Sequence, residues 1–128
     1  TSQSRRTRAF FEAISEGDAD RVLRILQMDF DVNCVEDTNS TPLHFAVEGT
    51  PDLAEILLKY GSNVNAKNKD GMTPLMVAIR FNDTASVELL LSYGADTQIV
   101  DRLGRDVVRY AEESKSSLIQ NLLREARR

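Results

Sequence analysis

A period of 32 or 33 residues constrains this chain more than any other feature. Thr-Pro-Leu-His at 41–44 is matched by Thr-Pro-Leu-Met at 73–76, and Tyr-Gly at 60–61 is matched by Tyr-Gly at 93–94. A repeat of this length is one supersecondary unit, which buries its apolar face by stacking on its neighbours. The sequence therefore predicts a repeat solenoid.

Two series of small and apolar residues keep the same register. Alanine recurs at Ala13, Ala46, Ala78 and Ala111, and leucine recurs at Leu26, Leu58, Leu91 and Leu123. The separation from alanine to leucine is 13, 12, 13 and 12 residues, so repeats two and four each lack one residue between their helices. We place the repeats at about 5–35, 36–67, 68–100 and 101–128, within a single domain that spans 1–128.

Each complete repeat is predicted to hold two helices and a tight turn. Thr41 suits a helix N-cap with proline after it, and Thr50 with its following proline repeats this device at the second helix. Gly71 and its counterparts Asn39 and Gly104 are expected to have positive φ in the turn between helix pairs. The predicted fold class is an all-α repeat solenoid of stacked helix-turn-helix units with β-hairpin or loop connections.

The period and the Thr-Pro-Leu-His element resemble the ankyrin repeat. The resemblance covers nearly the whole chain. It is strong in repeats two and three, moderate in repeat four and weak in repeat one, which lacks a hairpin arm. We interpret the two terminal repeats as caps of the array. The resemblance implies a binding surface without catalysis.

Composition and charge narrow the classes of partner and compartment. Sixteen basic and twenty acidic residues give a net charge of −4, which argues against a nucleic-acid partner. No stretch approaches the roughly 18 apolar residues of a membrane span. Cys34 is the only cysteine, which excludes an intrachain disulfide and favours an intracellular location, cytoplasmic or nuclear.

Few residues suit chemistry. His44 is the only histidine, and one histidine with one distant cysteine supplies neither a metal-ligand set nor a nucleophile–base pair. We expect no enzyme, no metal and no cofactor. The resemblance implies that His44 holds hairpin to helix and that Cys34 is a small filler. Asn33 and Asn65 hold a place where relatives can be hydroxylated, but a side chain bonded to its own turn is the favoured interpretation.

The resemblance further implies binding through the hairpin tips and the inner face of the first helices. Some positions on this face are not required by the fold. They are the two residues before the turn glycine, the one after it, and the second and third residues after the periodic alanine of each repeat. The candidate binding residues are Met72, Arg80, Phe81, Arg102, Leu103, Arg105, Asp70, Ser40 and Glu48.

Met72, Phe81 and Leu103 are apolar without evident need, and we expect them to converge on one patch bordered by arginines. The alternative is that Phe81 folds over the loop between helices and that Met72 packs along the hairpin. The opposite end of the face is acidic or neutral, as at Asp37 and Glu48.

These expectations define a monomeric adaptor or scaffold that docks another protein. Its partner is expected to be a segment with apolar anchors and some acidic residues, bound at repeats three and four in extended or helical form. The alternative is an ankyrin-type inhibitor that occludes or distorts a target enzyme.

Overall fold

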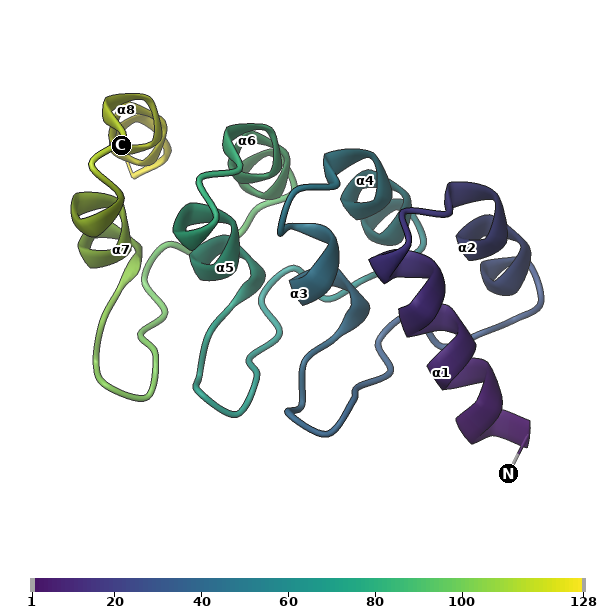
Figure 1. Ribbon diagram of the computed structural model, residues 1–128. Coiled ribbons are helices and arrows are strands. Elements are labelled where there is room, and N and C mark those ends of the chain that lie inside the picture. The colour runs from purple at the N-terminus through teal and green to yellow at the C-terminus, as the bar shows by residue number, and fades with distance from the viewer. Residues whose placement is uncertain (1, 128) are drawn as a thin grey trace.

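The computed structural model describes residues 2–127 and consists, over that range, of four helix pairs stacked in a row (Figure 1). The helices are α1 (Ser2–Ser15), α2 (Ala19–Leu26), α3 (Pro42–Ala46), α4 (Pro51–Lys59), α5 (Pro74–Arg80), α6 (Thr84–Ser92), α7 (Val107–Ser114) and α8 (Ser117–Ala126). The predicted all-α solenoid is confirmed. Its connections are loops built from turns, because residues 2–127 contain no β-strand.

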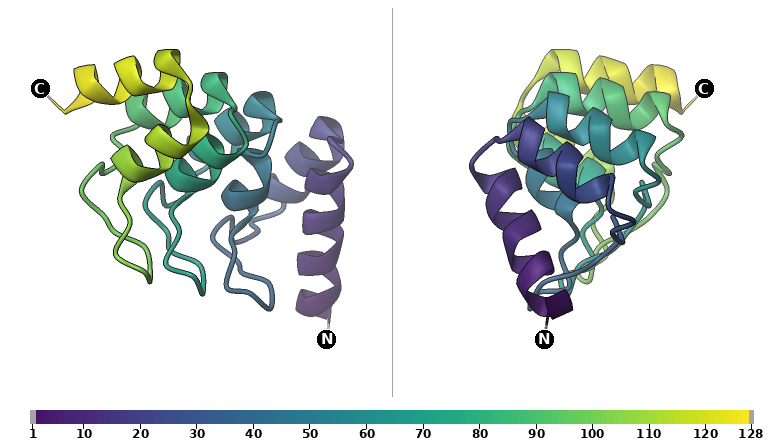
Figure 2. Two further views of the ribbon diagram at one scale, coloured as in Figure 1. Left: turned by 60° about the vertical axis from the view of Figure 1, so that its left-hand side comes forward. Right: turned by 90° about the vertical axis from the view of Figure 1, so that its right-hand side faces the viewer.

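The helices form two rows. The inner row consists of α1, α3, α5 and α7, and the outer row consists of α2, α4, α6 and α8 (Figure 1). Each helix from α3 to α8 contacts its pair mate and at least one helix of a neighbouring pair, as α5 does with α3, α6 and α7. Three hairpin-shaped loops hang side by side beyond the N-terminal ends of α3, α5 and α7 (Figure 2). None of the helices in residues 2–127 combines the length and apolar character that a bilayer crossing requires.

The core runs along the stack between the two rows. Large side chains such as Leu43, Leu57, Leu75 and Leu90 are fully buried in it. The four periodic alanines are also buried, each at 2% exposure or less. A larger side chain at an alanine position would have to displace close-packed neighbours, so these positions set how closely the helices approach.

Helix starts follow the predicted capping pattern with one exception. Thr41 and Thr73 accept hydrogen bonds from the backbone N–H groups of residues 44 and 76, and Asp106 caps α7 in the same way. Thr50 is the N-cap residue of α4 as expected, but its side chain makes no capping hydrogen bond. Its hydroxyl instead donates to the carbonyl of Ala46 at 2.7 Å, because the inner helix of repeat two ends close beside it.

The one-residue deletions in repeats two and four have different structural effects. In repeat two the inner helix is short, since α3 ends at Ala46 whereas α5 continues to Arg80. In repeat four the inner helix is complete, but only two residues separate α7 from α8. The first of these, Lys115, takes a left-handed conformation with φ of 60°.

The turn residues have the predicted backbone conformation. The φ angles of Asn39, Gly71 and Gly104 are 60°, 74° and 79°. Gly71 has a second constraint, because a Cβ atom added there would lie 2.7 Å from the backbone nitrogen of Arg102 in the next hairpin. Nothing lies within 4 Å of the equivalent point on Gly104. Gly71 is therefore required both for its conformation and for the approach of two repeats.

His44 links two repeats. Its Nδ1 atom accepts a hydrogen bond from the backbone N–H of Thr41 at 3.0 Å, and its Nε2 atom lies 2.8 Å from the carbonyl oxygen of Met72. The carbonyl must accept, so Nε2 carries the proton. The predicted structural role is confirmed and extends into the next repeat. Burial lowers the pKa of His44 below its ordinary value of 6.5, partly offset by the bond to Met72.

Asn33 and Asn65 also bridge repeats. Asn33 accepts from the backbone N–H of Asn63 at 2.8 Å and donates to the carbonyl of Gly61 at 3.2 Å. Asn65 accepts from the backbone N–H of Asp96 at 2.8 Å. The expectation that these side chains bond their own turns was wrong. The next repeat presents a backbone group at the same place each time, and only stacking brings it within reach.

The constraint on Gly71 predicts unequal costs for two alanine substitutions. Gly71→Ala should lower the free energy of unfolding by about 2 kcal/mol or more, since it adds a backbone clash to the strain of positive φ. Gly104→Ala should cost about 1 kcal/mol, because strain acts alone there. Urea denaturation monitored by circular dichroism would measure both. Equal losses would mean that the approach at Gly71 relaxes freely.

The buried imidazole predicts a pH dependence. Above pH 6.5 His44 is neutral in both states and its contribution to stability is complete. As pH falls below 6.5 the unfolded chain takes up a proton that the native state resists. The free energy of unfolding should therefore fall, by at most about 1.4 kcal/mol at pH 5.5.

The matched variant is His44→Met, because Met76 occupies the same place one repeat later. Urea denaturation at pH 7.5 and 5.5 should give a smaller pH-dependent loss for the variant than for the wild type. The same loss in both proteins would show that His44 is protonated with equal ease in the folded and unfolded chain.

Candidate interaction surface

The hairpin tips form a row in which one position changes charge from repeat to repeat. Asp37, Lys69 and Arg102 occupy equivalent places, and all three are exposed. Adjacent tips are joined by backbone hydrogen bonds: the N–H of Lys69 donates to Thr38 at 3.0 Å, and the N–H of Arg102 donates to Asp70 at 2.9 Å. The backbone of the tips is therefore fixed, while their side chains are available to solvent.

Two of the three apolar side chains predicted to form the binding patch are exposed. Leu103, at the third hairpin tip, is 75% exposed, and Phe81, which follows α5, is 54% exposed. Phe81 therefore does not fold over its loop into the protein. Arg80 and Arg102 are also exposed, and neither forms an ion pair within the described part of the chain. Asp70 and Glu48 are exposed as well.

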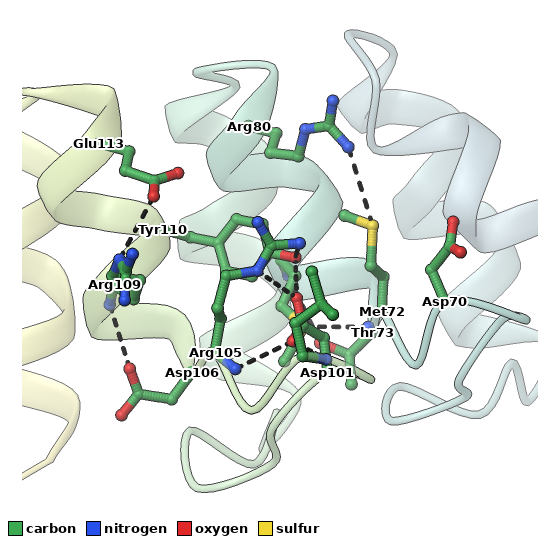
Figure 3. Close-up of polar contacts among 12 residues, drawn as sticks. Asp70, Met72, Thr73, Arg80, Asp101, Arg105, Asp106, Arg109, Tyr110 and Glu113 are labelled. Atoms are coloured by element: carbon green, nitrogen blue, oxygen red, sulfur yellow. Dashed lines mark hydrogen bonds and ion pairs between the residues drawn. The ribbon is translucent and has the colours of Figure 1, made fainter.

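Two predicted surface residues are buried instead. Ser40 is 7% exposed and Met72 is 6% exposed, at equivalent places after the turn residue. This position directly precedes the helix cap, where the chain turns back into the stack, and the carbonyl of Met72 receives the bond from His44. The Met72 sulfur lies 3.9 Å from Nη1 of Arg80 (Figure 3). The alternative that Met72 packs along the hairpin was the better interpretation.

The expected single apolar patch does not form. Met72 is buried, and the two exposed members lie at opposite ends of the inner face. Phe81 follows the C-terminal end of α5, whereas Leu103 lies on a hairpin tip beyond the N-terminal ends of the inner helices (Figure 1). At about 1.5 Å per residue, α5 alone accounts for roughly 10 Å of separation. A partner that contacts both residues must extend along the helix direction.

Arg105 belongs to a polar network within the fold (Figure 3). Its Nε atom donates to Asp101 at 2.8 Å, and its guanidinium lies 5.3 Å from the centre of the Tyr110 ring. Asp101 also accepts from the Tyr110 hydroxyl at 2.5 Å and from the backbone N–H groups of Arg105 and Leu103, each at 2.9 Å. The Arg105 charge is therefore committed to holding the third hairpin on α7.

The network shifts two pKa values in opposite directions. Burial alone would raise the pKa of Asp101, but the hydrogen bonds from Tyr110, Arg105 and Leu103 outweigh it and hold the pKa at about 2. Burial and the bond to the Asp101 carboxylate raise the pKa of Tyr110 to about 12. At neutral pH the site therefore holds a carboxylate, a guanidinium and a neutral phenol.

A sequence pattern not used above could have predicted the structural role of Asp101. Glu36, Asn68 and Asp101 occupy the place three residues before the turn residue in successive hairpins. Each side chain accepts the backbone N–H two residues later, at 2.9 Å in all three cases. An oxygen-bearing side chain recurring at this place predicts a cap for the hairpin tip.

A groove of about 680 Å³ was also missed. It lies between α1 and the first hairpin, and its lining includes Phe11, Phe45 and Val35. The rings of Phe11 and Phe45 meet edge to face with their centres 5.6 Å apart. Both are partly exposed, and Val35 is 44% exposed. The groove exists because repeat one supplies a long helix where the other repeats supply a hairpin and a shorter inner helix.

Comparison with known proteins agrees with this geometry. The family model described as Ankyrin repeats (3 copies) matches residues 10–101. The chain belongs to the ankyrin-repeat family. It is 34% identical to an ankyrin repeat-containing protein of Schizosaccharomyces pombe over 72% of this chain and 44% of that protein.

Two larger proteins also contain similar segments. The chain is 38% identical to the human BCL-6 corepressor-like protein 1 over 74% of its length, which is 5% of that protein. It is 40% identical to the Drosophila melanogaster neurogenic locus Notch protein over 61% of its length, which is 3% of that protein. The chain thus spans less than half the length of each of these relatives.

Ankyrin repeats are generally non-catalytic protein-interaction modules. Burial, with the Asp31 charge, raises the pKa of the Cys34 thiol to about 11, so the thiol is protonated at neutral pH. No group of three or more His, Cys, Asp or Glu side chains within the described residues could hold a metal ion.

The buried carboxylate predicts a stability loss with a defined pH window. Asp101→Asn should lower the free energy of unfolding by about 2 kcal/mol at pH 7, because charged hydrogen bonds to Tyr110 and Arg105 are lost. The folded pKa lies below the unfolded value of 3.8, so this stability is present above pH 3.8 and is lost as pH falls through about 2.

Urea denaturation at pH 7 and pH 3 would measure the effect. The control is Asp70→Asn, since Asp70 is exposed and its carboxylate makes no hydrogen bond or ion pair within residues 2–127. The difference between wild type and Asp101→Asn should be smaller at pH 3. An equal effect of the two substitutions at pH 7 would contradict the network.

Proposed function

We propose that this domain is an adaptor or scaffold module that binds a segment of another protein along its inner face and hairpin tips. The observation that carries the proposal is the exposure of Phe81 and Leu103 beside Arg80 and Arg102, two arginines that the described fold leaves without ion pairs. Arginine is enriched among the residues that contribute most to binding, and aromatic residues such as Phe81 are enriched in protein interfaces. Asp70 and Glu48 are exposed on the same face, whereas the charge of Arg105 is taken up by Asp101.

The chemistry of this end favours a partner with apolar anchors and acidic residues. The anchors would contact Phe81 and Leu103, and the acidic residues would pair with Arg80 and Arg102. The repeats hold these side chains on a fixed backbone, so binding would cost little ordering entropy. We further propose that the domain acts as a monomer in an intracellular compartment, cytoplasmic or nuclear.

The proposal predicts that exposed apolar residues on the inner face matter more for binding than equally exposed ones elsewhere. The test variant carries Phe81→Ser and Leu103→Ser. The control carries Met28→Ser and Leu118→Ser, whose side chains are 57% and 54% exposed and lie on or next to outer helices. Affinity capture from cell lysate with mass spectrometry would identify partners, and titration with each purified partner would give affinities.

Partners held by the wild type should be retained by the control and lose at least tenfold in affinity with the test variant, about 1.4 kcal/mol or more. Arg80→Glu with Arg102→Glu should weaken the same partners, more strongly at low salt. All variants should unfold at nearly the wild-type temperature. A partner that binds both double serine variants equally well would place its site elsewhere.

A further inference from the structure

We propose that the groove between α1 and the first hairpin is a second docking site, for an extended and positively charged segment of a partner protein. This inference deepens the proposed function by giving one partner contact a chemistry. It rests on that function only in that both surfaces bind protein segments. Three independent observations support it: an apolar floor, an unpaired hairpin edge and a concentration of acidic residues.

The floor suits one apolar side chain. Phe11 from α1 and Phe45 from α3 form an edge-to-face pair, and Val35 lies beside them on the hairpin arm. None of the three is fully buried, so each has surface that a partner could cover. A volume of about 680 Å³ lies within the range of sites that enclose ligand groups. The long aliphatic stem of a lysine or arginine would also pack on such rings.

The hairpin edge beside the groove lacks the hydrogen bond that its counterparts make. Lys69 and Arg102 donate their N–H groups to carbonyls of the preceding hairpin. Asp37 occupies the same place in the first hairpin, and its N–H has no hydrogen bond within residues 2–127. Where the preceding hairpin would lie, repeat one has α1. An extended segment could supply the missing carbonyl and continue the row of hairpins.

The charge around the groove is acidic. Its lining includes Glu12, Glu36 and Asp37 against a single lining cation, Arg8. Of the three carboxylates, only Glu12 has an ion-pair partner within residues 2–127, Arg21 at 4.0 Å. The imbalance extends beyond the groove, since residues 25–58 contain seven acidic residues and no lysine or arginine. Asp37 makes no ion pair within the described residues, so its charge serves no contact in the fold.

Charge complementarity therefore selects a basic segment. Its lysines or arginines would face the hairpin wall, where the acidic residues gather, and Arg8 would remain at the α1 side. Figure 2 shows α1 alongside the first hairpin, with its N-terminal end near the hairpin tip. A segment lying between them would contact both elements along its length. Acidic segments would be repelled here and directed to the arginines of repeats three and four.

The test uses a fluorescein-labelled peptide of sequence Lys-Leu-Lys-Phe-Lys and its counterpart Glu-Leu-Glu-Phe-Glu. An extended strand places the two apolar side chains of each on one side. Fluorescence anisotropy would give affinities, and amide chemical shifts of the ¹⁵N-labelled protein would locate the site. The basic peptide should bind at least tenfold more tightly, with its largest shifts at Phe11, Val35, Asp37 and Phe45.

Two pairs of variants separate the groove from general charge attraction. Asp37→Lys and Val35→Ser should each weaken the basic peptide at least fivefold. Glu88→Lys is the matched charge reversal, because Glu88 is exposed and makes no ion pair within the described residues. Val100→Ser is the matched apolar change, because Val100 occupies the place of Val35 two repeats later and is 46% exposed. Both controls should bind as the wild type does.

The proposal is overturned if Glu88→Lys weakens the basic peptide as much as Asp37→Lys does, since the attraction would then be non-specific. Equal affinity for both peptides, no measurable binding, or shifts centred on Phe81 and Leu103 would overturn it too. These results are separate from the capture experiment, whose variants leave the groove intact. Failure at one surface would therefore not decide the other.

Discussion

The contact between neighbouring repeats is the interaction on which this structure depends. One helix pair cannot bury its apolar face alone, so each repeat is completed by the next. Polar bonds fix the register of that contact: His44 reaches the carbonyl of Met72, and Asn65 receives the N–H of Asp96. Each crosses a repeat boundary and satisfies a backbone group. The register of the repeats therefore determines where every exposed side chain of the inner face lies.

Stacking also separates positions that the fold needs from positions that it leaves free. The residue directly after the turn residue, Ser40 or Met72, is buried because the chain turns back into the stack there. The place two residues before the turn residue carries Asp37, Lys69 or Arg102, all of them exposed, and at Lys69 and Arg102 the backbone N–H bonds the preceding hairpin. A change of side chain at the tip therefore leaves these backbone bonds in place.

Local features of the fold could be predicted from the sequence, whereas contacts between repeats could not. The Thr41 cap and the positive φ at Gly71 depend on a few adjacent residues, and both predictions were confirmed. The burial of Met72 and the engagement of Arg105 with Tyr110 depend on the direction of side chains in a stacked hairpin. The groove depends on which element replaces the first hairpin, and residue spacing does not specify that.

The two ends of the hairpin row differ in charge, and their separation determines how the difference acts. Helices packed side by side lie about 8–10 Å apart, so the first and third tips are separated by roughly 20 Å. That is about twice the Debye length at physiological salt, so Asp37 and Arg102 would act on a partner almost independently. A segment that is basic at one end and acidic at the other would gain both interactions in one orientation. A segment bound in the opposite direction would lose both interactions, so the charge pattern would favour one direction of binding.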